Sequence, residues 1–202
     1  MPLLTKRIKF YLFFLTCNNL IRKRRSLRDT EFKLLLYFIL IQQVIDAKRF
    51  IKTYSFSVSN FKLSSTSGKT VELSKVKSKF IIIYFYPKDN TSGCTIETND
   101  FNKLLSKFEK LGCTIFGISK DSLESHEKWS KKLNLKFELL ADEDKTSLKA
   151  YKAWAKKKFM GREFMGTVRS TFVVEKNKII KEWRNVKAVG HAAEVLDFIK
   201  NY

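Results

Sequence analysis

The stretch Pro87-Lys-Asp-Asn-Thr-Ser-Gly-Cys94 directly follows the apolar run Phe80-Ile-Ile-Ile-Tyr-Phe-Tyr86. A short run of aromatic and β-branched residues is typical of a strand that is buried on both faces. Pro87 ends this strand, because proline has no N–H group to donate to a neighbour in the middle of a sheet. The two segments therefore predict a central strand with a loop at its carboxyl end.

The residues on the carboxyl side of Cys94 change to a helical spacing. The apolar positions that follow this spacing are Ile96, Phe101, Leu104, Leu105 and Phe108, and Gly112 ends the pattern. We expect Cys94 in the first turn of this helix, where unpaired N–H groups and the positive end of the helix dipole stabilise a thiolate. Two interpretations are open for Cys94, a reactive nucleophile or a small buried hydrophobic residue.

The neighbours of Cys94 favour the reactive interpretation. Thr91 could place a hydroxyl beside the sulfur, and Gly93 would let backbone N–H groups approach closely. The pattern Pro87-x-x-x-Thr91-x-x-Cys94 resembles the signature of the peroxiredoxins, which are thiol peroxidases on a thioredoxin fold. The continuation Cys94-Thr-Ile-Glu97 is similar to the bacterioferritin-comigratory, or Q-type, branch of that family. Further stretches in the order of the family are Gly117–Ser122, Leu139–Asp142, Arg169–Phe172 and Trp183–Val186.

The resemblance covers residues 54–202 and leaves residues 1–53 as a basic, partly apolar N-terminal extension. Residues 1–50 carry a net charge of +8 out of the +20 of the chain. Their apolar runs, residues 10–15 and 34–41, are each shorter than the ~18 residues that span a bilayer. The extension is a candidate targeting or anchoring segment; the alternative is an upstream extension of a gene whose functional start lies nearer the domain.

Strands and helices alternate along residues 54–202. A capping box at Asp121 and Glu124 predicts the start of another helix. A hairpin with its turn at residues 176–177 follows, and then a last helix after Gly190. This order predicts an α/β fold, a thioredoxin-like sandwich with a central mixed β-sheet flanked by helices.

Peroxide reduction requires a thiolate that attacks one oxygen of an O–O bond while the other oxygen leaves. The resemblance implies that Cys94 is this nucleophile, that Thr91 holds the peroxide oxygen and that Pro87 shields the site from water. Arg169 matches the arginine that lies beside the thiolate in the family and fixes the leaving oxygen. Glu97 matches the glutamate of the branch, although an acid that complements the helix dipole is an equally open interpretation.

Arg169 is also singled out by composition. Only three of the twenty-nine basic residues after position 50 are arginines. Where lysine is the usual cation, an arginine suggests a need for a planar group with several donors. The position of Arg169 beside the predicted strand at Thr171 makes it the best candidate of the three.

The histidines and cysteines give no pattern typical of a metal site. His126 falls on an amphipathic helix and is expected to be solvated, and His191 is expected to be a helix cap or a surface group. With two histidines and three cysteines far apart, we expect neither a metal nor another cofactor.

The cysteines also bear on how the enzyme is recycled. Many members of the family carry a resolving cysteine five residues after the peroxidatic one, and this chain has Asn99 there. Cys113 begins a predicted buried strand, which favours a structural role, and Cys17 lies in the extension. We therefore expect an external thiol, from thioredoxin, glutaredoxin or a small molecule, to reduce the sulfenic acid of Cys94.

Together these features predict a thiol-dependent peroxidase that reduces hydrogen peroxide and organic hydroperoxides in antioxidant defence. We expect a monomer in a reducing compartment, the cytoplasm or an organelle such as a plastid. The alternative is a basic membrane- or nucleic-acid-associated protein with a degenerate peroxiredoxin domain. No nucleic acid is expected, because the basic residues after position 50 are scattered and lack a base-stacking or helix-turn-helix motif. Membrane contact through the extension is left open.

Overall fold

The computed structural model of the chain describes residues 58–159 and 161–202, which belong to one unit that runs from Ser55 to Tyr202. The predicted extension, residues 1–53 with Cys17, lies outside the described residues. The elements are β1 (Lys62–Ser65), β2 (Thr70–Glu72), η1 (Leu73–Lys75), β3 (Phe80–Phe85), α3 (Ser92–Lys110), β4 (Cys113–Ser119), α4 (Leu123–Leu133), β5 (Glu138–Ala141), α5 (Thr146–Ala150), β6 (Trp154–Phe159), β7 (Arg162–Thr167), β8 (Ser170–Glu175), β9 (Lys178–Arg184) and α6 (His191–Asn201). Within the described part of the chain, no helix is long and apolar enough to cross a membrane.

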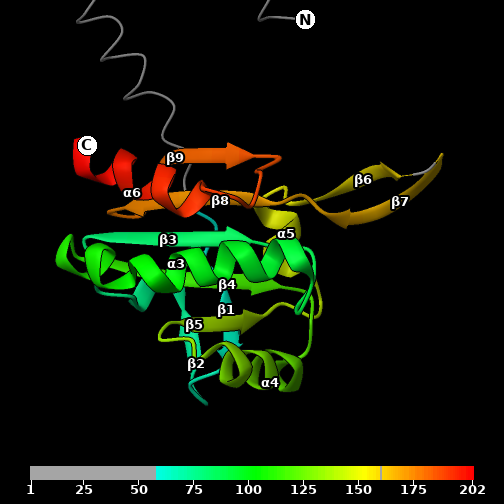
Figure 1. Ribbon diagram of the computed structural model, residues 1–202, viewed down its shortest axis with the longest axis horizontal. Coiled ribbons are helices and arrows are strands. Elements are labelled where there is room, and N and C mark those ends of the chain that lie inside the picture. The colour runs from blue at the N-terminus through cyan, green and yellow to red at the C-terminus, as the bar shows by residue number, and fades with distance from the viewer. Residues whose placement is uncertain (1–57, 160) are drawn as a thin grey trace, which may run out of the picture. The chain divides into compact units, whose positions relative to one another are not determined.

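A seven-stranded sheet runs through the unit in the order β2-β1-β5-β4-β3-β8-β9 (Figure 1). β3 pairs in parallel with β4 and β4 in parallel with β5, whereas β8 pairs antiparallel with the other side of β3. Helices cover both faces of this mixed sheet. The predicted α/β sandwich with a central mixed sheet is therefore confirmed.

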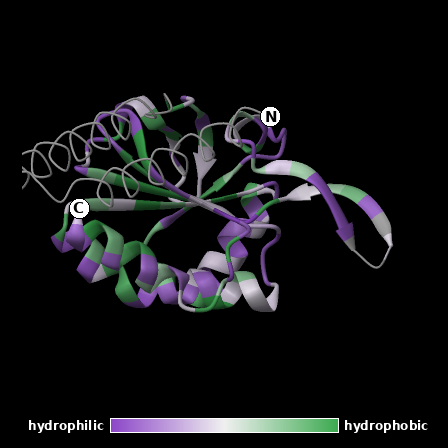
Figure 2. Ribbon diagram, turned by 90° about the horizontal axis from the view of Figure 1, so that it is seen from above, coloured by the Kyte–Doolittle hydropathy of each residue, from purple (hydrophilic) through white to green (hydrophobic). Residues whose placement is uncertain are grey.

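β3 is the central strand that its composition predicts, and all six of its residues are buried. Successive side chains of a strand point to opposite faces. Ile82 and Tyr84 pack in a core cluster with residues of α3, α4 and α6, while Ile83 and Phe85 pack in a second cluster with residues of α5. In Figure 2 the strands in the middle of the sheet are largely hydrophobic, whereas the helices carry both colours. Burial on both faces explains the continuous apolar run.

α3 follows β3 and carries Cys94 in its first turn, as predicted. Thr91 is the N-cap residue, and the first helical hydrogen bond runs from the Thr95 N–H to the Thr91 carbonyl at 2.8 Å. The helix ends beside Gly112, whose φ of +74° lies in the left-handed region that glycine adopts without a steric penalty. Cys94 is thus the third residue of the helix.

The predicted capping box at the start of α4 was wrong. The N-cap of this helix is Ser122, whose side chain accepts a hydrogen bond from the Ser125 N–H at 3.3 Å. Asp121 instead accepts hydrogen bonds from the Asp89 N–H and from Ser119 Oγ. Aspartate and serine are both favoured at the N-cap. Because Asp121 is engaged by the Asp89 N–H, Ser122 takes the cap position.

Of the hairpins β8–β9 and β6–β7, the sequence predicts only the first. The β8–β9 turn at Lys176 and Asn177 was predicted, and both residues have positive φ, as a two-residue hairpin turn requires. The β6–β7 hairpin was not predicted, and it extends away from the rest of the unit (Figure 1). Its lysine-rich strands have mostly exposed or half-buried side chains, so burial imposes no apolar alternation on them.

Candidate active site

The site begins at the carboxyl end of β3, where the loop of residues 87–91 leads into α3. The N–H groups of the first helical turn, which includes Cys94, have no partner within the helix. The side chain of Cys94 is nevertheless buried, with 1% of the residue exposed, and it belongs to the same apolar cluster as Tyr84 and Tyr86. Cys94 therefore combines the polar environment of a helix start with a dry surrounding.

Arg169 reaches Cys94 from the strand next to β3. Ser170, the first residue of β8, is the register partner of Phe85, the last residue of β3. This antiparallel pairing brings the residue before β8 next to the start of α3. Arg169 Nη2 donates a hydrogen bond to Cys94 Sγ at 3.3 Å. Sequence positions 75 residues apart thus form the central contact of the site.

The same guanidinium group is held by Glu97. Arg169 Nη1 donates to Glu97 Oε2 and forms an ion pair with it, and the glutamate side chain is 0% exposed against 14% for the arginine. Within residues 58–159 and 161–202, Glu97 Oε1 has no hydrogen-bond partner. Glu97 thus contacts the guanidinium that touches Cys94, and its part in the reaction stays a prediction.

The charges of this group are set by burial and by proximity. Burial raises the pKa of Glu97 to about 7, although Arg169 acts in the opposite direction. Burial also acts to lower the pKa of Arg169, but Glu97 and Cys94 outweigh it, and the pKa is raised. Arg169 therefore stays charged, and its guanidinium places a cation in hydrogen-bond contact with the Cys94 sulfur.

The remaining loop residues lie near Cys94 but make other contacts. Thr91 is exposed and its hydroxyl donates to the Lys88 carbonyl at 3.2 Å. Pro87 is half-buried at the start of the loop. A Cβ atom placed on Gly93 would lie 3.5 Å from Arg169 Nη2, so the absence of a side chain keeps the arginine accessible there. The structure brings Cys94 and Arg169 together and leaves the roles of Thr91 and Pro87 as predictions.

Both predictions about histidine exposure were wrong. His126 is fully buried, and its ring lies between the Asp89 carboxylate and the Leu140 carbonyl. His191 is also buried, with Nε2 2.8 Å from Thr171 Oγ1, and burial lowers its pKa. One signal was present in the sequence for His126, because the buried Trp129 lies three residues further on the same helix face.

Cys113 lies far from Cys94. It is the first residue of β4 and follows the end of α3, whereas Cys94 lies at the start of that helix. Lys110 lies sixteen positions after Cys94 on α3, which corresponds to about 24 Å of helix. Burial also raises the pKa of the Cys113 thiol to about 11, so it is a poor nucleophile near neutral pH. The expected structural role of Cys113 fits this position.

Comparison with known proteins agrees with the fold and identifies the family. The model of the AhpC/TSA family matches residues 56–183, so the chain belongs to this family of thiol peroxidases. Peroxiredoxin Bcp of Bacillus subtilis is 45% identical over 143 residues, which are 70% of this chain and 91% of that protein. Peroxiredoxin Q, chloroplastic, of Triticum aestivum is 37% identical over 146 residues, 70% of this chain and 64% of that protein.

A solved structure extends the comparison to three dimensions. Peroxiredoxin Q of Xanthomonas campestris matches with a TM-score of 0.67 and 38% identity over 70% of this chain and 90% of its own. The chain is a peroxiredoxin of the bacterioferritin-comigratory, or Q-type, branch. These relatives support the prediction of a thiol peroxidase and not the alternative of a degenerate domain with a binding role.

Proposed function

We propose that this peroxiredoxin reduces hydrogen peroxide and organic hydroperoxides through Cys94, with Arg169 as the group that fixes the peroxide. The observation that carries this proposal is the hydrogen bond from Arg169 Nη2 to Cys94 Sγ at a helix start. One solved structure of the Xanthomonas campestris bacterioferritin comigratory protein concerns its alkyl peroxide reduction activity, which supports an organic substrate here.

The chemistry follows from the position of the arginine. The Cys94 thiolate attacks one oxygen of the peroxide, an S–O bond forms and the O–O bond breaks. The leaving oxygen takes a proton and departs as water or an alcohol. Arg169 lies beside the sulfur, so its fork can donate to the oxygens on which negative charge develops. Glu97 holds the plane of the guanidinium, and Gly93 leaves room beside it.

The loop residues complete this proposed site. Thr91 is the N-cap of the helix that carries Cys94, and its hydroxyl can turn from the Lys88 carbonyl toward a bound peroxide. Pro87 brings no N–H group and shields the sulfur from water. These roles rest on the position of both residues within the loop that precedes Cys94.

Reduction of the oxidised enzyme requires a thiol from outside the chain. Asn99 stands on α3 at the place of a resolving cysteine, and Cys113 lies at the opposite end of that helix. A disulfide needs two Cα atoms within about 7 Å. The sulfenic acid therefore condenses with an external thiol, which forms a mixed disulfide and releases water. A second external thiol then attacks this mixed disulfide, and Cys94 leaves as the free thiol. The proposed reductant is thioredoxin, glutaredoxin or a small thiol.

We further propose that residues 54–202 are the catalytic domain and that residues 1–53 target or anchor it. Support comes from the basic and apolar composition of the extension, and one relative is named as chloroplastic. A reducing compartment suits a chain with three cysteines and no paired framework. Cys94, Glu97 and Arg169 come from the same chain, which supports a monomer as the working unit.

The proposal is tested by a peroxidase assay with dithiothreitol as reductant. Cys94→Ser should abolish turnover, because an alkoxide does not form under conditions in which the thiolate does. Cys113→Ser and Cys17→Ser are the matched controls and should keep most of the activity. Undiminished turnover in Cys94→Ser would contradict the proposal.

A further inference from the structure

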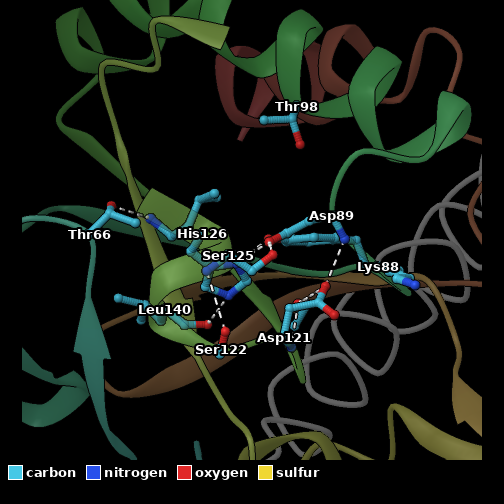
Figure 3. Close-up of polar contacts among 12 residues, drawn as sticks. Thr66, Lys88, Asp89, Thr98, Asp121, Ser122, Ser125, His126 and Leu140 are labelled. Atoms are coloured by element: carbon cyan, nitrogen blue, oxygen red, sulfur yellow. Dashed lines mark hydrogen bonds and ion pairs between the residues drawn. The ribbon is translucent and has the colours of Figure 1, made fainter. Parts of the chain in front are cut away.

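A buried polar cluster lies directly beside the loop that precedes Cys94 (Figure 3). Its centre is Asp89, whose carboxylate accepts three hydrogen bonds. Tyr86 Oη donates to Oδ1 at 2.8 Å, and Ser125 Oγ and His126 Nδ1 bond to Oδ2 at 2.7 and 2.8 Å. Asp89 is 6% exposed and His126 is 0% exposed. Two elements far apart in the sequence, the loop and α4, are joined here by largely buried polar groups.

The hydrogen bonds of this cluster involve both ring nitrogens of His126. Nδ1 faces the Asp89 carboxylate, and Nε2 lies 3.2 Å from the Leu140 carbonyl oxygen, so each nitrogen faces an acceptor oxygen. Burial acts to raise the pKa of Asp89, but the bonds from His126, Ser125 and Tyr86 outweigh it, and the pKa is lowered. His126 Nδ1 and Asp89 Oδ2 lie at ion-pair distance, 2.8 Å.

The loop backbone is held at the same place. The Asp89 N–H donates to Asp121 Oδ2 at 2.7 Å, and Asp121 also accepts from Ser119 Oγ at 2.9 Å. The next residue, Asn90, has a φ of +55° and its side chain accepts from Lys132 Nζ at 2.9 Å. A non-glycine residue in the left-handed region is held there by its surroundings. The contacts to β4 and α4 thus determine the shape of the loop.

We propose that Asp89 and His126 are positioning residues of the peroxidase reaction. Their ion pair fixes the loop of residues 87–91, and the loop fixes the first turn of α3 against Arg169. This inference rests on the proposed function and deepens it, because it assigns the orientation of the site to a pair that does not touch the sulfur. Asp89 lies two residues before the N-cap Thr91, whereas Arg169 immediately precedes β8. A shift of the loop therefore moves one half of the site and leaves the other in place.

A shift of the loop would lower the reaction rate by misaligning Cys94 with Arg169. A displacement of about 1 Å in a catalytic arrangement can lower a rate by roughly a hundredfold. Attack on a peroxide requires that the sulfur, the arginine and the donors of the loop are all correctly placed around the two peroxide oxygens. Alkylation of the same sulfur by iodoacetamide needs the thiolate but no donors aligned with a peroxide. The two reactions therefore separate a positioning role from a general effect on Cys94.

The test compares Asp89→Asn with the wild type by stopped-flow oxidation with hydrogen peroxide and by alkylation of Cys94. Asparagine keeps the shape of the side chain and removes the charge that pairs with His126. The second-order rate with peroxide should fall about tenfold or more, while the alkylation rate should change by less than about threefold. In Asp89→Asn, the added change His126→Gln should have little further effect, because the pair acts as one unit.

The matched control is Asp142→Asn. Asp142 is also a buried carboxylate, and it accepts hydrogen bonds from the Thr146 and Leu148 N–H groups at the start of α5. Its loss should lower the melting temperature and leave the peroxide rate within about twofold of the wild type. A comparable loss of stability in the two variants, with a peroxide defect in only one, supports the positioning role.

A milder variant keeps the test decisive if Asp89→Asn does not fold. Ser125→Ala removes one neutral donor from Asp89 and keeps the ion pair, and it should lower the peroxide rate less than Asp89→Asn does. Peroxide rates within about twofold of the wild type in the foldable variants, or a parallel fall in alkylation, would overturn the inference. Absence of Cys94-dependent oxidation in the wild type would instead contradict the proposed function.

Discussion

One arginine side chain joins the two acidic groups of this site. The planar fork of Arg169 places Nη2 on Cys94 Sγ and Nη1 on Glu97. A lysine presents a single ammonium group on a flexible stem and cannot bind the sulfur and the glutamate at once in the same fixed geometry. The orientation of the cation is therefore as important as its charge.

Arg169→Lys is expected to slow the reaction with peroxide while leaving a positive charge near the sulfur. The second-order rate should fall roughly ten- to a thousandfold, which is about 1.4–4 kcal/mol of transition-state stabilisation. Arg184→Lys is the control, since Arg184 stacks on Phe172 and donates to the Tyr151 carbonyl at the end of α5. Stopped-flow rates near the wild-type value in Arg169→Lys would exclude this arginine from the site.

Glu97 is expected to make stability depend on pH. Its folded-state pKa of about 7 lies above the ordinary value of 4.5, so between these values the folded protein binds more protons than the unfolded chain. Stability therefore falls as pH rises through this window, by up to about 3 kcal/mol. Glu97→Gln cannot ionise and escapes this loss.

Urea unfolding at about pH 5 and about pH 8 measures this difference. The free energy of unfolding of Glu97→Gln relative to the wild type should rise between the two conditions by up to about 3 kcal/mol. If the difference in the free energy of unfolding between the two proteins is the same at about pH 5 and at about pH 8, the pKa of Glu97 is not raised.

At the scale of elements, the close approach of β3 and β4 depends on Gly117. A Cβ atom at this position would lie 2.6 Å from Tyr84 Cζ and 2.7 Å from Leu139 Cδ2. Tyr84 shares a hydrogen bond with Thr98 of α3, so the packing reaches from the sheet to the helix of Cys94. The glycine is required here because the neighbouring strands leave no space for a side chain.

Gly117→Ala should therefore be destabilising by about 1–3 kcal/mol, since overpacking displaces Tyr84 or the backbone of β4. Thr114→Ser on the same strand keeps its hydroxyl beside Ser78 and should cost less. Urea unfolding of both variants provides the comparison. An unchanged midpoint in Gly117→Ala would show that the strands separate without cost.

The sequence predicts those elements whose pattern comes from burial. Almost every apolar residue of β3 and α3 is buried or packs against the core. Composition and spacing are therefore enough to predict these two elements. The cap of α4 depends on whether Asp121 meets the Asp89 N–H, a contact across 32 residues. The β6–β7 hairpin has no buried face to impose a pattern. Both features follow from tertiary contacts that spacing does not reveal.

The site divides in the same way. Cys94 and Arg169 were predicted from a signature, and their contact follows from the register of β3 with β8. His126 was expected in water because charged residues surround it in the sequence. The buried acceptors that hold it, Asp89 and the Leu140 carbonyl, come from other elements. Spacing along one helix carries no information about them.

At the scale of the whole molecule, α3 separates the two described cysteines. Cys94, the proposed nucleophile, lies at its start and Cys113 lies beyond its end. A stretch of helix about 24 Å long runs between the two positions, so local movement of one loop is not expected to bring the two sulfurs together. This arrangement supports the proposed recycling of Cys94 by an external thiol.

Excess peroxide without a reductant should inactivate the protein. When no thiol is added, the Cys94 sulfenic acid is expected to react with a second peroxide and become a sulfinic acid. Turnover measured after such treatment should be lost and should not return on addition of dithiothreitol. Full recovery of activity would indicate a protective disulfide and contradict the recycling scheme.

The most direct measurement is intact-protein mass spectrometry after one equivalent of hydrogen peroxide in the presence of dimedone. We expect one dimedone adduct on Cys94 in the wild type and in Cys113→Ser, and no adduct in Cys94→Ser. That result would show a sulfenic acid at the predicted nucleophile that no other thiol of the chain resolves. A prompt, quantitative disulfide between Cys94 and Cys113 would contradict it, and so would an adduct that persists in Cys94→Ser.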